Sequence, residues 1–156
     1  MKRFNVIGGL PRSGSTLLSN ILNEHPNIFV SDTSPVAVGT ISAVNSTVSR
    51  PEYLSEVDND PEGTKQRLLI AARGFVSGWY GFRAEDFVFD KDRSNVWIDN
   101  YDSFKRIFPA GKIVIMVRDP RDVFASIVSK RNKNPLGWSS NTRRNLLNQS
   151  ENLFSP

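Results

Sequence analysis

The sequence predicts an α/β fold of three layers, in which a mostly parallel sheet is flanked by helices. Three observations indicate this fold. Short apolar runs alternate with longer amphipathic segments, the first run leads through a glycine-rich loop into a helix, and residues 113–117 form a continuous apolar run. Alternating strands and helices favour parallel pairing. A continuous β-branched run is typical of a strand that is buried on both faces of such a sheet.

Two strands and one helix are expected within the first 30 residues. The apolar run at 4–7 and the helical pattern that continues to about Glu24 predict a βα unit. The helix is expected to end before Pro26, because proline disfavours a helical conformation in the residue before it. Residues 28–30 predict a short second strand.

Capping residues predict where the next helix begins. Thr33 or Ser34 is expected to be its N-cap, with Pro35 in the first helical position, where a missing N–H costs nothing. This helix of small residues is expected to end near Ser49. Residues 50–63, which contain five acidic residues, are expected to form an exposed loop.

The second half of the chain continues the alternation. Apolar residues at helical spacing predict a helix over 62–80, and a brief apolar strand at 87–89 is expected to lead into a charged run. A helix is expected from about 101 to 108, followed by the buried strand at 113–117. Pro120 is expected to open the last helix, which continues through Ser129.

The composition fits a single globular domain over residues 1–156. The chain is 38% hydrophobic and 23% charged, which suits a soluble protein with one core. Residues 131–156 are expected to be a polar tail that is partly helical. Cysteine is absent, so disulfides and thiolate sites are excluded, and the single histidine gives no set of metal ligands.

Membrane association is not expected. No apolar run approaches the roughly 20 residues that span a bilayer. Too few apolar residues precede Pro11 for a signal peptide. A cytoplasmic protein is therefore the simplest expectation.

The net charge of +4 is distributed unevenly. Residues 123–150 contain five basic residues and no acidic residue, a pattern that attracts polyanions. Nucleic acid and an anionic cofactor are both candidates, and a solvated face is the alternative to either. The cofactor is favoured over nucleic acid because Arg118 directly precedes this region.

Residues 8–18, with the sequence GGLPRSGSTLL, are the most informative stretch. From Gly9 the spacing is G-x-x-x-x-G followed by Ser-Thr, which is P-loop-like except that the lysine of nucleoside triphosphatases is missing. Free N–H groups at the start of the following helix attract an anion. The fixed positive charge comes from Arg12 instead of that lysine. The loop is therefore expected to bind an anion other than a triphosphate.

This loop resembles the 5′-phosphosulfate loop of the sulfotransferase family, whose pattern is close to P-R-S-G-[ST]-[ST]-L. Residues 112–126 resemble the 3′-phosphate site of the same family: a strand ending in Arg118, the run R-D-P-R-D, and a helix that carries Ser126. The resemblance covers residues 4–131 and is greatest to bacterial and phage members with tyrosylprotein-like motifs. It implies a bacterial or phage enzyme.

The resemblance implies 3′-phosphoadenosine 5′-phosphosulfate (PAPS) as the donor, adenosine 3′,5′-bisphosphate as the product, and no metal. It implies these cofactor-binding residues: Pro11, Arg12, Ser13, Gly14, Ser15, Thr16, Leu17, Arg118 and Ser126. An ordinary glycine-rich turn is the alternative for the loop. For Arg118, the alternative is a surface ion pair with Asp119 or Asp122. For Arg121, a structural ion pair and a contact with phosphate are equally expected.

The resemblance also implies catalytic residues. Arg12 is expected to contact the transferred group. Lys91 stands where tyrosylprotein-like enzymes have a catalytic lysine in an N-K-D-P context, here D-K-D-R, and is expected to stabilise the leaving group. A solvated lysine in a charged turn is the alternative for Lys91.

The general base is less clearly marked. The glutamate pair of tyrosylprotein-like enzymes falls on Asp32 and Thr33, and Asp32 is the candidate base, with helix capping as its alternative. His25 is a rival base, although the K-T-H context of cytosolic sulfotransferases is absent and a cap at the helix end is its alternative.

Three polar segments, 10–16, 90–93 and 118–126, each follow a predicted strand and are expected to converge on one site. The function implied is metal-independent, in-line transfer of a sulfuryl group to a hydroxyl or amine of an unidentified acceptor. A non-catalytic module that binds adenosine bisphosphate is the alternative, because the downstream basic segment of the family is not recognisable after Ser126. A P-loop kinase-like phosphotransferase is disfavoured by the missing lysine. A homo-oligomer is a possible assembly.

Overall fold

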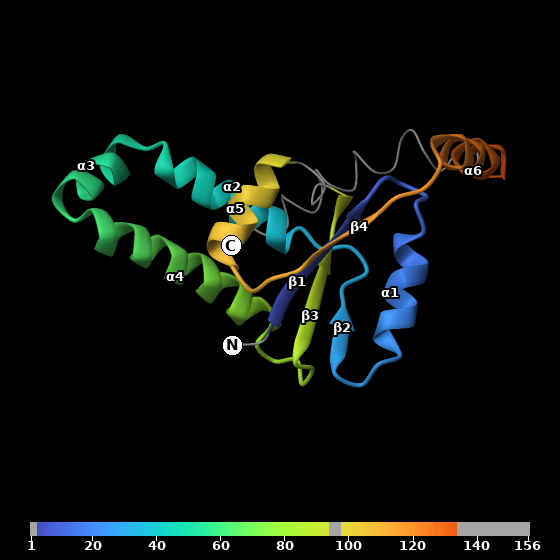
Figure 1. Cartoon of the computed structure of the whole chain (residues 1–156), viewed down its shortest axis with the longest axis horizontal. Coiled ribbons are helices and arrows are strands. Elements are labelled where there is room, and N and C mark those ends of the chain that lie inside the picture. The colour runs from blue at the N-terminus through green and yellow to red at the C-terminus, as the bar shows by residue number, and fades with distance from the viewer. Residues whose placement is uncertain (1–2, 94–97, 134–156) are drawn as a thin grey trace, which may run out of the picture. The chain divides into compact units, whose positions relative to one another are not determined.

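A computed structural model describes residues 3–93 and 98–133, and it separates into two compact units, Met1–Val117 and Arg118–Pro156. The first unit contains a four-stranded sheet with helices on both faces (Figure 1). The described part of the second unit consists mainly of helix α6 (Pro120–Lys133), where the sequence predicts one. Most of the expected polar tail lies outside the described residues, from 134 onward.

The sheet confirms the predicted fold class. Its strands are β1 (Arg3–Gly9), β2 (Ile28–Val30), β3 (Phe87–Lys91) and β4 (Ile113–Met116). They are ordered β2-β3-β1-β4, and every neighbouring pair is parallel. The carboxyl ends of all four strands therefore lie at the same edge of the sheet.

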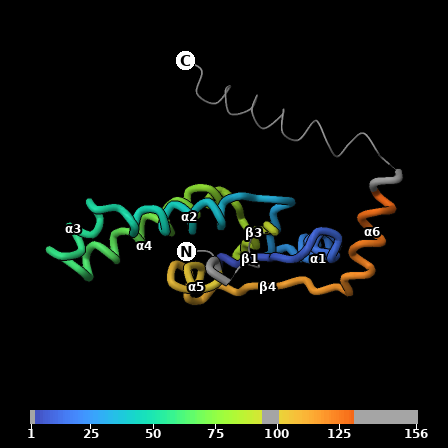
Figure 2. The backbone as a smooth tube through the Cα atoms, turned by 90° about the horizontal axis from the view of Figure 1, so that it is seen from above, coloured from blue at the N-terminus to red at the C-terminus, as the bar shows by residue number. Residues whose placement is uncertain are grey.

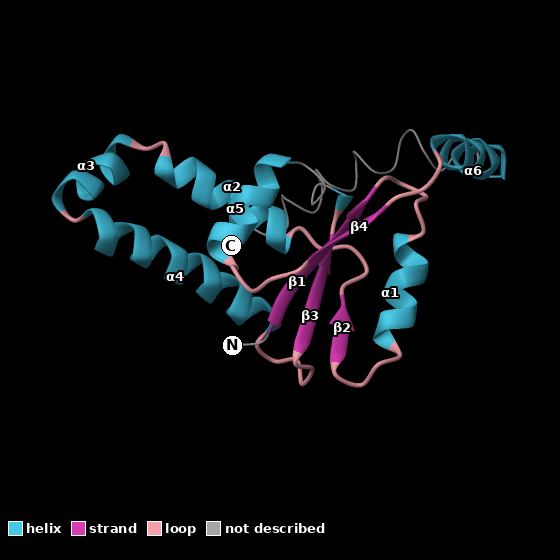
Figure 3. Ribbon diagram, viewed as in Figure 1, coloured by secondary structure: helices cyan, strands magenta, loops and turns pink. Residues whose placement is uncertain are grey.

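Helices cover the two faces of the sheet unequally (Figures 2 and 3). One face carries α1, which contacts β1 and β2, and the other carries α2, α4 and α5. Helices α2 and α4 extend away from the sheet, and helix α3 connects them at the ends that lie farthest from it. The bounds of the helices are α1 (Ser15–Asn23), α2 (Val36–Val48), α3 (Pro51–Asn59), α4 (Pro61–Tyr80) and α5 (Ile98–Ile107).

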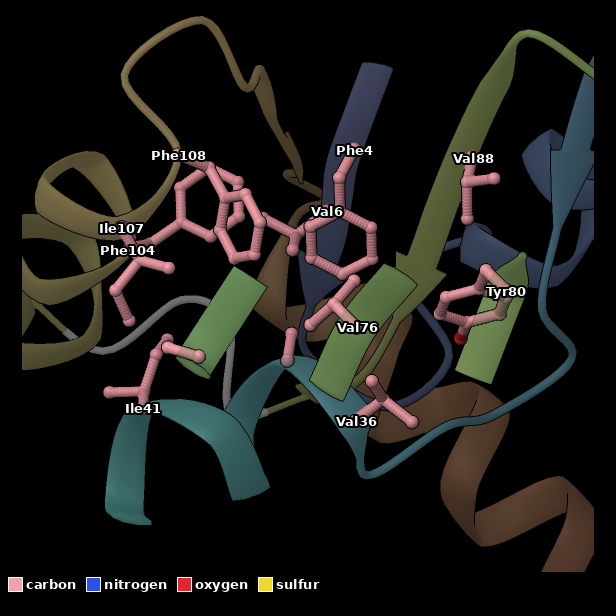
Figure 4. Close-up of a cluster of buried hydrophobic side chains, with 12 residues drawn as sticks. Phe4, Val6, Val36, Ile41, Val76, Tyr80, Val88, Phe104, Ile107 and Phe108 are labelled. Atoms are coloured by element: carbon pink, nitrogen blue, oxygen red, sulfur yellow. The ribbon is translucent and has the colours of Figure 1, made fainter. Parts of the chain in front are cut away.

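The hydrophobic core lies between the sheet and the larger helical layer (Figure 4). Phe4 is central, with its ring centroid 4.8 Å from that of Phe108, 5.9 Å from that of Tyr80 and 6.2 Å from that of Phe104. Alternate residues of a strand point to opposite faces, so Phe4 and Val6 of β1 and Val88 of β3 contribute to this core together. The next residue on each strand points toward the α1 face.

The expectation of a loop over 50–63 is wrong, because most of that segment is helix α3. Pro51 takes the first helical position, where its missing N–H costs nothing, and Glu52 lies in the first turn, where the helix dipole favours a negative charge. Asp60 then caps α4, accepting a hydrogen bond from the Gly63 N–H at 3.0 Å. The acidic residues of this segment are thus helix-start residues as well as surface charges.

The expectation that β4 is buried on both faces is also wrong. It is the last strand in the described sheet and pairs only with β1 there, and Ile115 is 50% exposed. Two smaller differences concern helix and strand ends. Strand β3 includes Asp90 and Lys91, and α2 begins at Val36, so Pro35 is its N-cap rather than its first helical residue.

Candidate functional site

The register of the sheet brings two of the three predicted polar segments to one edge. Ile7 of β1 is level with Lys91 of β3, and Gly9 at the end of β1 is level with Met116 of β4. The loop at 10–14 and the segment at 92–93 therefore leave the sheet from neighbouring strands. The segment that begins at Arg118 belongs to the second unit.

The loop has a backbone that only particular residues adopt easily. Gly14, the N-cap of α1, has a φ of 102°, in the left-handed region that glycine tolerates, and Arg12 also has a positive φ, of 69°. Gly9 permits a close approach of a different kind. A Cβ atom there would lie 2.9 Å from the Met116 carbonyl oxygen and 2.8 Å from the Ser13 Oγ atom. The two glycines thus let the loop fold back against the end of β4.

The start of α1 is suited to an anion. The helix begins at Ser15, has no acidic residue in its first turn and receives no side-chain cap from Gly14. Its first N–H groups are therefore available to a negative ligand. Ser13 lies in the loop with only 6% of its surface exposed, and its buried hydroxyl has no hydrogen-bond partner among the described residues. A phosphate or sulfate oxygen is a fitting partner for such a group.

The remaining loop residues surround this helix start. The Ser13 N–H donates to the Leu10 carbonyl at 3.1 Å, which closes the turn, and Leu18 N–H donates to the Gly14 carbonyl at 3.1 Å, which starts the helix. Several of the predicted contact residues are exposed: Pro11, Arg12, Thr16 and Leu17. Ser15 is half-buried. These exposed residues of the predicted donor loop are therefore accessible to a ligand from solution.

Lys91 lies on the same face of the sheet as α1. It is level with Ile7, and alternation along β3 places its side chain opposite to that of Asp90. Only 8% of Lys91 is exposed, and its ammonium group forms no hydrogen bond or ion pair with another described residue. The interpretation of Lys91 as a solvated residue in a charged turn is wrong, because it is a buried residue of β3.

Asp32 lies on an exposed turn that is attached to the end of β3. The Ser31 N–H donates to the Phe89 carbonyl at 3.0 Å, and the Ser34 N–H donates to the Lys91 carbonyl at 3.0 Å. The Lys91 N–H in turn donates to the Ser31 Oγ atom at 2.9 Å. The turn at 31–34 and the strand end that carries Lys91 therefore form one hydrogen-bonded unit.

The first N–H groups of α2 are bound by residues other than Asp32. The Val36 N–H donates to the Ser34 Oγ atom at 3.2 Å, and the backbone of Ala37 hydrogen-bonds the Asp90 carboxylate. Ser34, one of the two predicted caps, thus satisfies one N–H of the helix start. Helix capping does not account for Asp32.

A buried polar cluster lies below this turn, and the sequence did not reveal it. Asp90 is fully buried, and its Oδ2 atom accepts hydrogen bonds from the Ser34 hydroxyl at 2.7 Å and the Tyr80 hydroxyl at 2.8 Å. Burial raises the pKa of Asp90 to about 6. Burial and the nearby Asp90 charge also raise the pKa of Tyr80 above its usual range. The only sequence signal was an acidic residue in phase with the apolar Val88.

His25 does not belong to this edge of the sheet. It follows α1, whose nine residues separate it from the loop by a distance on the order of 13 Å. The His25 Nδ1 atom accepts a hydrogen bond from the Asn27 N–H at 3.2 Å in an exposed turn. His25 is therefore a turn residue at the opposite end of the sheet rather than a base beside the loop.

In the second unit, two arginines behave differently. Arg121 forms a short, exposed pair with Asp119, with an Nη2 to Oδ2 distance of 2.7 Å, which lowers the pKa of the Asp119 carboxyl. The Arg118 Nε atom lies 3.8 Å from the Asp122 Oδ2 atom, a long and exposed contact that contributes little stability. Ser126 lies on α6 and is half-buried. Arg121 is thus already engaged with a carboxylate, and the Arg118 ion pair is weak enough to exchange.

The described residues contain neither a metal-binding group nor a helix that could span a membrane. No group of three or more His, Cys, Asp or Glu side chains within 3–93 and 98–133 is arranged to hold a metal ion. In the same part of the chain, no helix combines the length and the apolar character that a membrane span requires.

Comparison with known proteins identifies a family. A sequence model described as the sulfotransferase family matches residues 6–153. Among curated proteins, the chain is 28% identical to human protein-tyrosine sulfotransferase 1 over 126 residues and 29% identical to that of Danio rerio over 133 residues. It is 27% identical to protein-tyrosine sulfotransferase 2 of Gallus gallus over 132 residues.

These matches cover the chain and its relatives to different extents. Each includes 80% of this chain, but only 34% of the human protein, 35% of the Danio rerio protein and 33% of the Gallus gallus protein. The chain therefore corresponds to about a third of the length of the curated relatives it matches.

Proposed function

The chain belongs to the sulfotransferase family, and on that premise we propose that it transfers a sulfuryl group from PAPS to a hydroxyl of an acceptor. The names of the relatives make the phenolic hydroxyl of a protein tyrosine the first acceptor to test. Binding of the donor and turnover of an acceptor are separate parts of this proposal, and different residues support each.

The observation that carries the proposal is the loop at the start of α1. It combines helix N–H groups that have no side-chain cap, the guanidinium of Arg12 in the adjacent turn, and the buried hydroxyl of Ser13, which has no partner among the described residues. These groups suit the 5′ end of PAPS, where a phosphate and a sulfate adjoin. We assign the loop residues 11–17 to this end of the donor.

PAPS supplies a sulfuryl group on a good leaving group. In the proposed reaction the acceptor oxygen forms a bond to sulfur while the bond from sulfur to the 5′-phosphate oxygen breaks, and that oxygen takes the electron pair. Lys91, a buried cation on the α1 face, would stabilise the charge that develops there. Asp32 on the adjoining turn would take the acceptor proton. Arg12 would hold the sulfuryl oxygens in line.

We assign the 3′-phosphate of the donor to Arg118 and Ser126. Support comes from the sequence motif, in which a strand is followed by Arg118, the run R-D-P-R-D and a helix that carries Ser126. A guanidinium grips phosphate through two parallel hydrogen bonds.

Incubation with ³⁵S-labelled PAPS or ³²P-labelled ATP, with and without Mg²⁺, tests the proposal. A tyrosine-containing acidic peptide and a simple phenol serve as acceptors. Release of adenosine 3′,5′-bisphosphate with label on the acceptor, in the absence of Mg²⁺, is the expected result. Tight binding of adenosine 3′,5′-bisphosphate without turnover of any acceptor would favour a binding module. Label transferred from ATP only with Mg²⁺ would overturn the proposal.

A further inference from the structure

Asp90 is a buried carboxylate that the proposed transfer does not use directly. It immediately precedes Lys91 on β3, but alternation directs it to the opposite face of the sheet, level with Val6 in the core layer. None of its surface is exposed, so it cannot reach a donor or an acceptor. Its influence on the site must pass through the groups that it contacts.

Those contacts join four parts of the fold. The carboxylate belongs to β3, accepts a hydrogen bond from Tyr80 at the end of α4, and accepts another from Ser34 in the turn that carries Asp32. It is also hydrogen-bonded by the backbone of Ala37 in the first turn of α2. The Tyr80 and Ser34 oxygens are 3.0 Å apart, so the cluster closes on itself.

Stability alone gives a poor account of an acid at this position. Burying an ionised carboxylate costs free energy unless its hydrogen bonds are nearly ideal, and an apolar side chain of similar size often serves a core as well. The Asp90 carboxylate does contribute a rigid connection. A single carboxylate oxygen, Oδ2, accepts hydrogen bonds from both Ser34 in the turn and Tyr80 at the end of α4. The hydrogen bond from the Ser34 N–H to the Lys91 carbonyl connects the same turn to β3.

We propose that Asp90 is a positioning residue, which fixes the turn bearing Asp32 against the strand end bearing Lys91. The geometry required is that of an in-line transfer, in which the proton acceptor and the leaving-group cation must keep a constant separation. The inference rests on the proposed function, because it assigns Asp90 a part in the same reaction. It does not involve the donor loop directly, because neither Asp90 nor the two hydroxyls that it binds belong to residues 10–17.

Asp90→Asn is the central variant. The amide is the same size, but it carries no negative charge and places an NH2 group, which can only donate, where the carboxylate has its second oxygen. We expect kcat to fall about tenfold or more, as for loss of a positioning contact. The dissociation constant of adenosine 3′,5′-bisphosphate should stay within about twofold, since the loop is untouched. Tyr80→Phe, which removes one donor to the carboxylate, should show the same pattern more weakly.

Asn5→Ala is the matched control. Asn5 is also buried and polar and also connects strands, because its side chain donates to the Val88 carbonyl and accepts from the Lys112 N–H. It lies nearer the amino end of β1, away from the proposed site. A purely structural role for Asp90 predicts that both variants lose activity in proportion to their loss of stability. Such a common relation, or an unchanged kcat in Asp90→Asn, would overturn the proposal.

Amide hydrogen exchange tests the same inference without a measurement of enzymatic activity. In Asp90→Asn, or in Tyr80→Phe if the first variant fails to fold, amide exchange over 31–37 and 90–92 should accelerate while exchange over 10–18 stays constant. Unchanged exchange over 31–37 and 90–92 would overturn the inference. A wild-type protein that neither binds adenosine 3′,5′-bisphosphate nor transfers sulfate would instead overturn the proposed function. The two failures are therefore distinguishable.

Discussion

Lys91 is a buried lysine at the end of β3, on the face of the sheet that carries α1. The sequence predicted a catalytic role for it, with a solvated lysine in a charged turn as the alternative, and the structure places it at the end of β3, 8% exposed and level with Ile7. A buried ammonium is costly unless a negative partner is present for part of the time. The developing charge on the 5′-phosphate of a donor is such a partner.

Replacing Lys91 by Met tests this role. Removal of one group that stabilises transition-state charge should lower kcat by about 100-fold or more. The dissociation constant of adenosine 3′,5′-bisphosphate should rise by less than about threefold, because the loop amides are unaffected. Steady-state kinetics with equilibrium dialysis would measure both quantities. Lys65→Met, which removes an exposed lysine paired with Glu62, is the control and should change neither.

Arg118 and Arg121 form a natural comparison for the 3′-phosphate. Arg118→Ala should weaken binding of adenosine 3′,5′-bisphosphate about tenfold, the effect of losing one charged hydrogen-bonding contact. Arg121→Ala removes the same charge, but from a side chain already paired with Asp119, and should change the dissociation constant by less than about twofold. Isothermal titration of both variants provides the test. Equal losses would mean that the two arginines contribute only general positive charge.

Asp90 should give the protein a measurable pH dependence of stability. Burial raises its pKa from 3.8 to about 6, with Asp92 adding to the rise and hydrogen bonds from Ser34, Tyr80 and Ala37 opposing it. The folded state therefore holds this proton more tightly than the unfolded state. Its contribution to the free energy of unfolding is greatest below about pH 4 and is lost as the pH rises through about 6.

Urea unfolding of wild type and Asp90→Asn at several pH values measures this effect. Between about pH 3.5 and 7, the wild-type free energy of unfolding should fall by roughly 3 kcal/mol relative to the variant, the equivalent of a shift of about two pKa units. Other carboxylates titrate alike in both proteins and cancel in the difference. Parallel profiles would show that Asp90 titrates normally.

At the level of elements, local patterns predicted most of the fold and long-range partners were missed. The strand at 28–30 was predicted from a short apolar run, and the helix at 62–80, which the structure shows as Pro61–Tyr80, from apolar residues at helical spacing. Helix α3 was not predicted, because it has no fully buried residue and its composition is that of a loop. Its stability comes from packing on α4, which no local window reveals.

The candidate site shows the same division. The loop at 10–16 was predicted because its chemistry is contiguous in sequence. The Asp90 cluster was not, since Ser34 lies 56 residues away from Asp90 along the chain and Tyr80 lies ten residues away. Whether a strand residue faces the core or the α1 layer depends on the register with the neighbouring strand. Three consecutive apolar residues at 87–89 do not indicate which of them face the core.

The junction of β1 with the loop gives a prediction at this scale. Gly9→Ala would place a Cβ atom 2.9 Å from the Met116 carbonyl oxygen, so β4 must shift, and we expect destabilisation by about 1–3 kcal/mol. Gly39→Ala is the matched control, since a Cβ atom there meets nothing within 4 Å, and helix propensity should stabilise α2 by up to about 1 kcal/mol. Denaturant unfolding of both variants distinguishes a steric effect from a general intolerance of alanine.

At the scale of the whole molecule, the parallel sheet is what collects the polar segments. Strands β1, β2 and β3 all end at one edge, so the loop at 10–14, the turn at 31–34 and the segment at 92–93 emerge side by side. An antiparallel arrangement of the same strands in this order would have sent the segment at 92–93 to the edge opposite the loop and the turn. The fold class, which the sequence predicted, thus already implied where the site should be sought.

That arrangement also leaves the amino-terminal edge of the sheet available for experiment. The turn between α1 and β2 lies there, and Asn27 in it is exposed. Because the chain contains no cysteine, a thiol introduced by Asn27→Cys would be unique. A fluorophore attached at that thiol would report on rearrangements of the protein from a distance, without obstructing entry of a nucleotide.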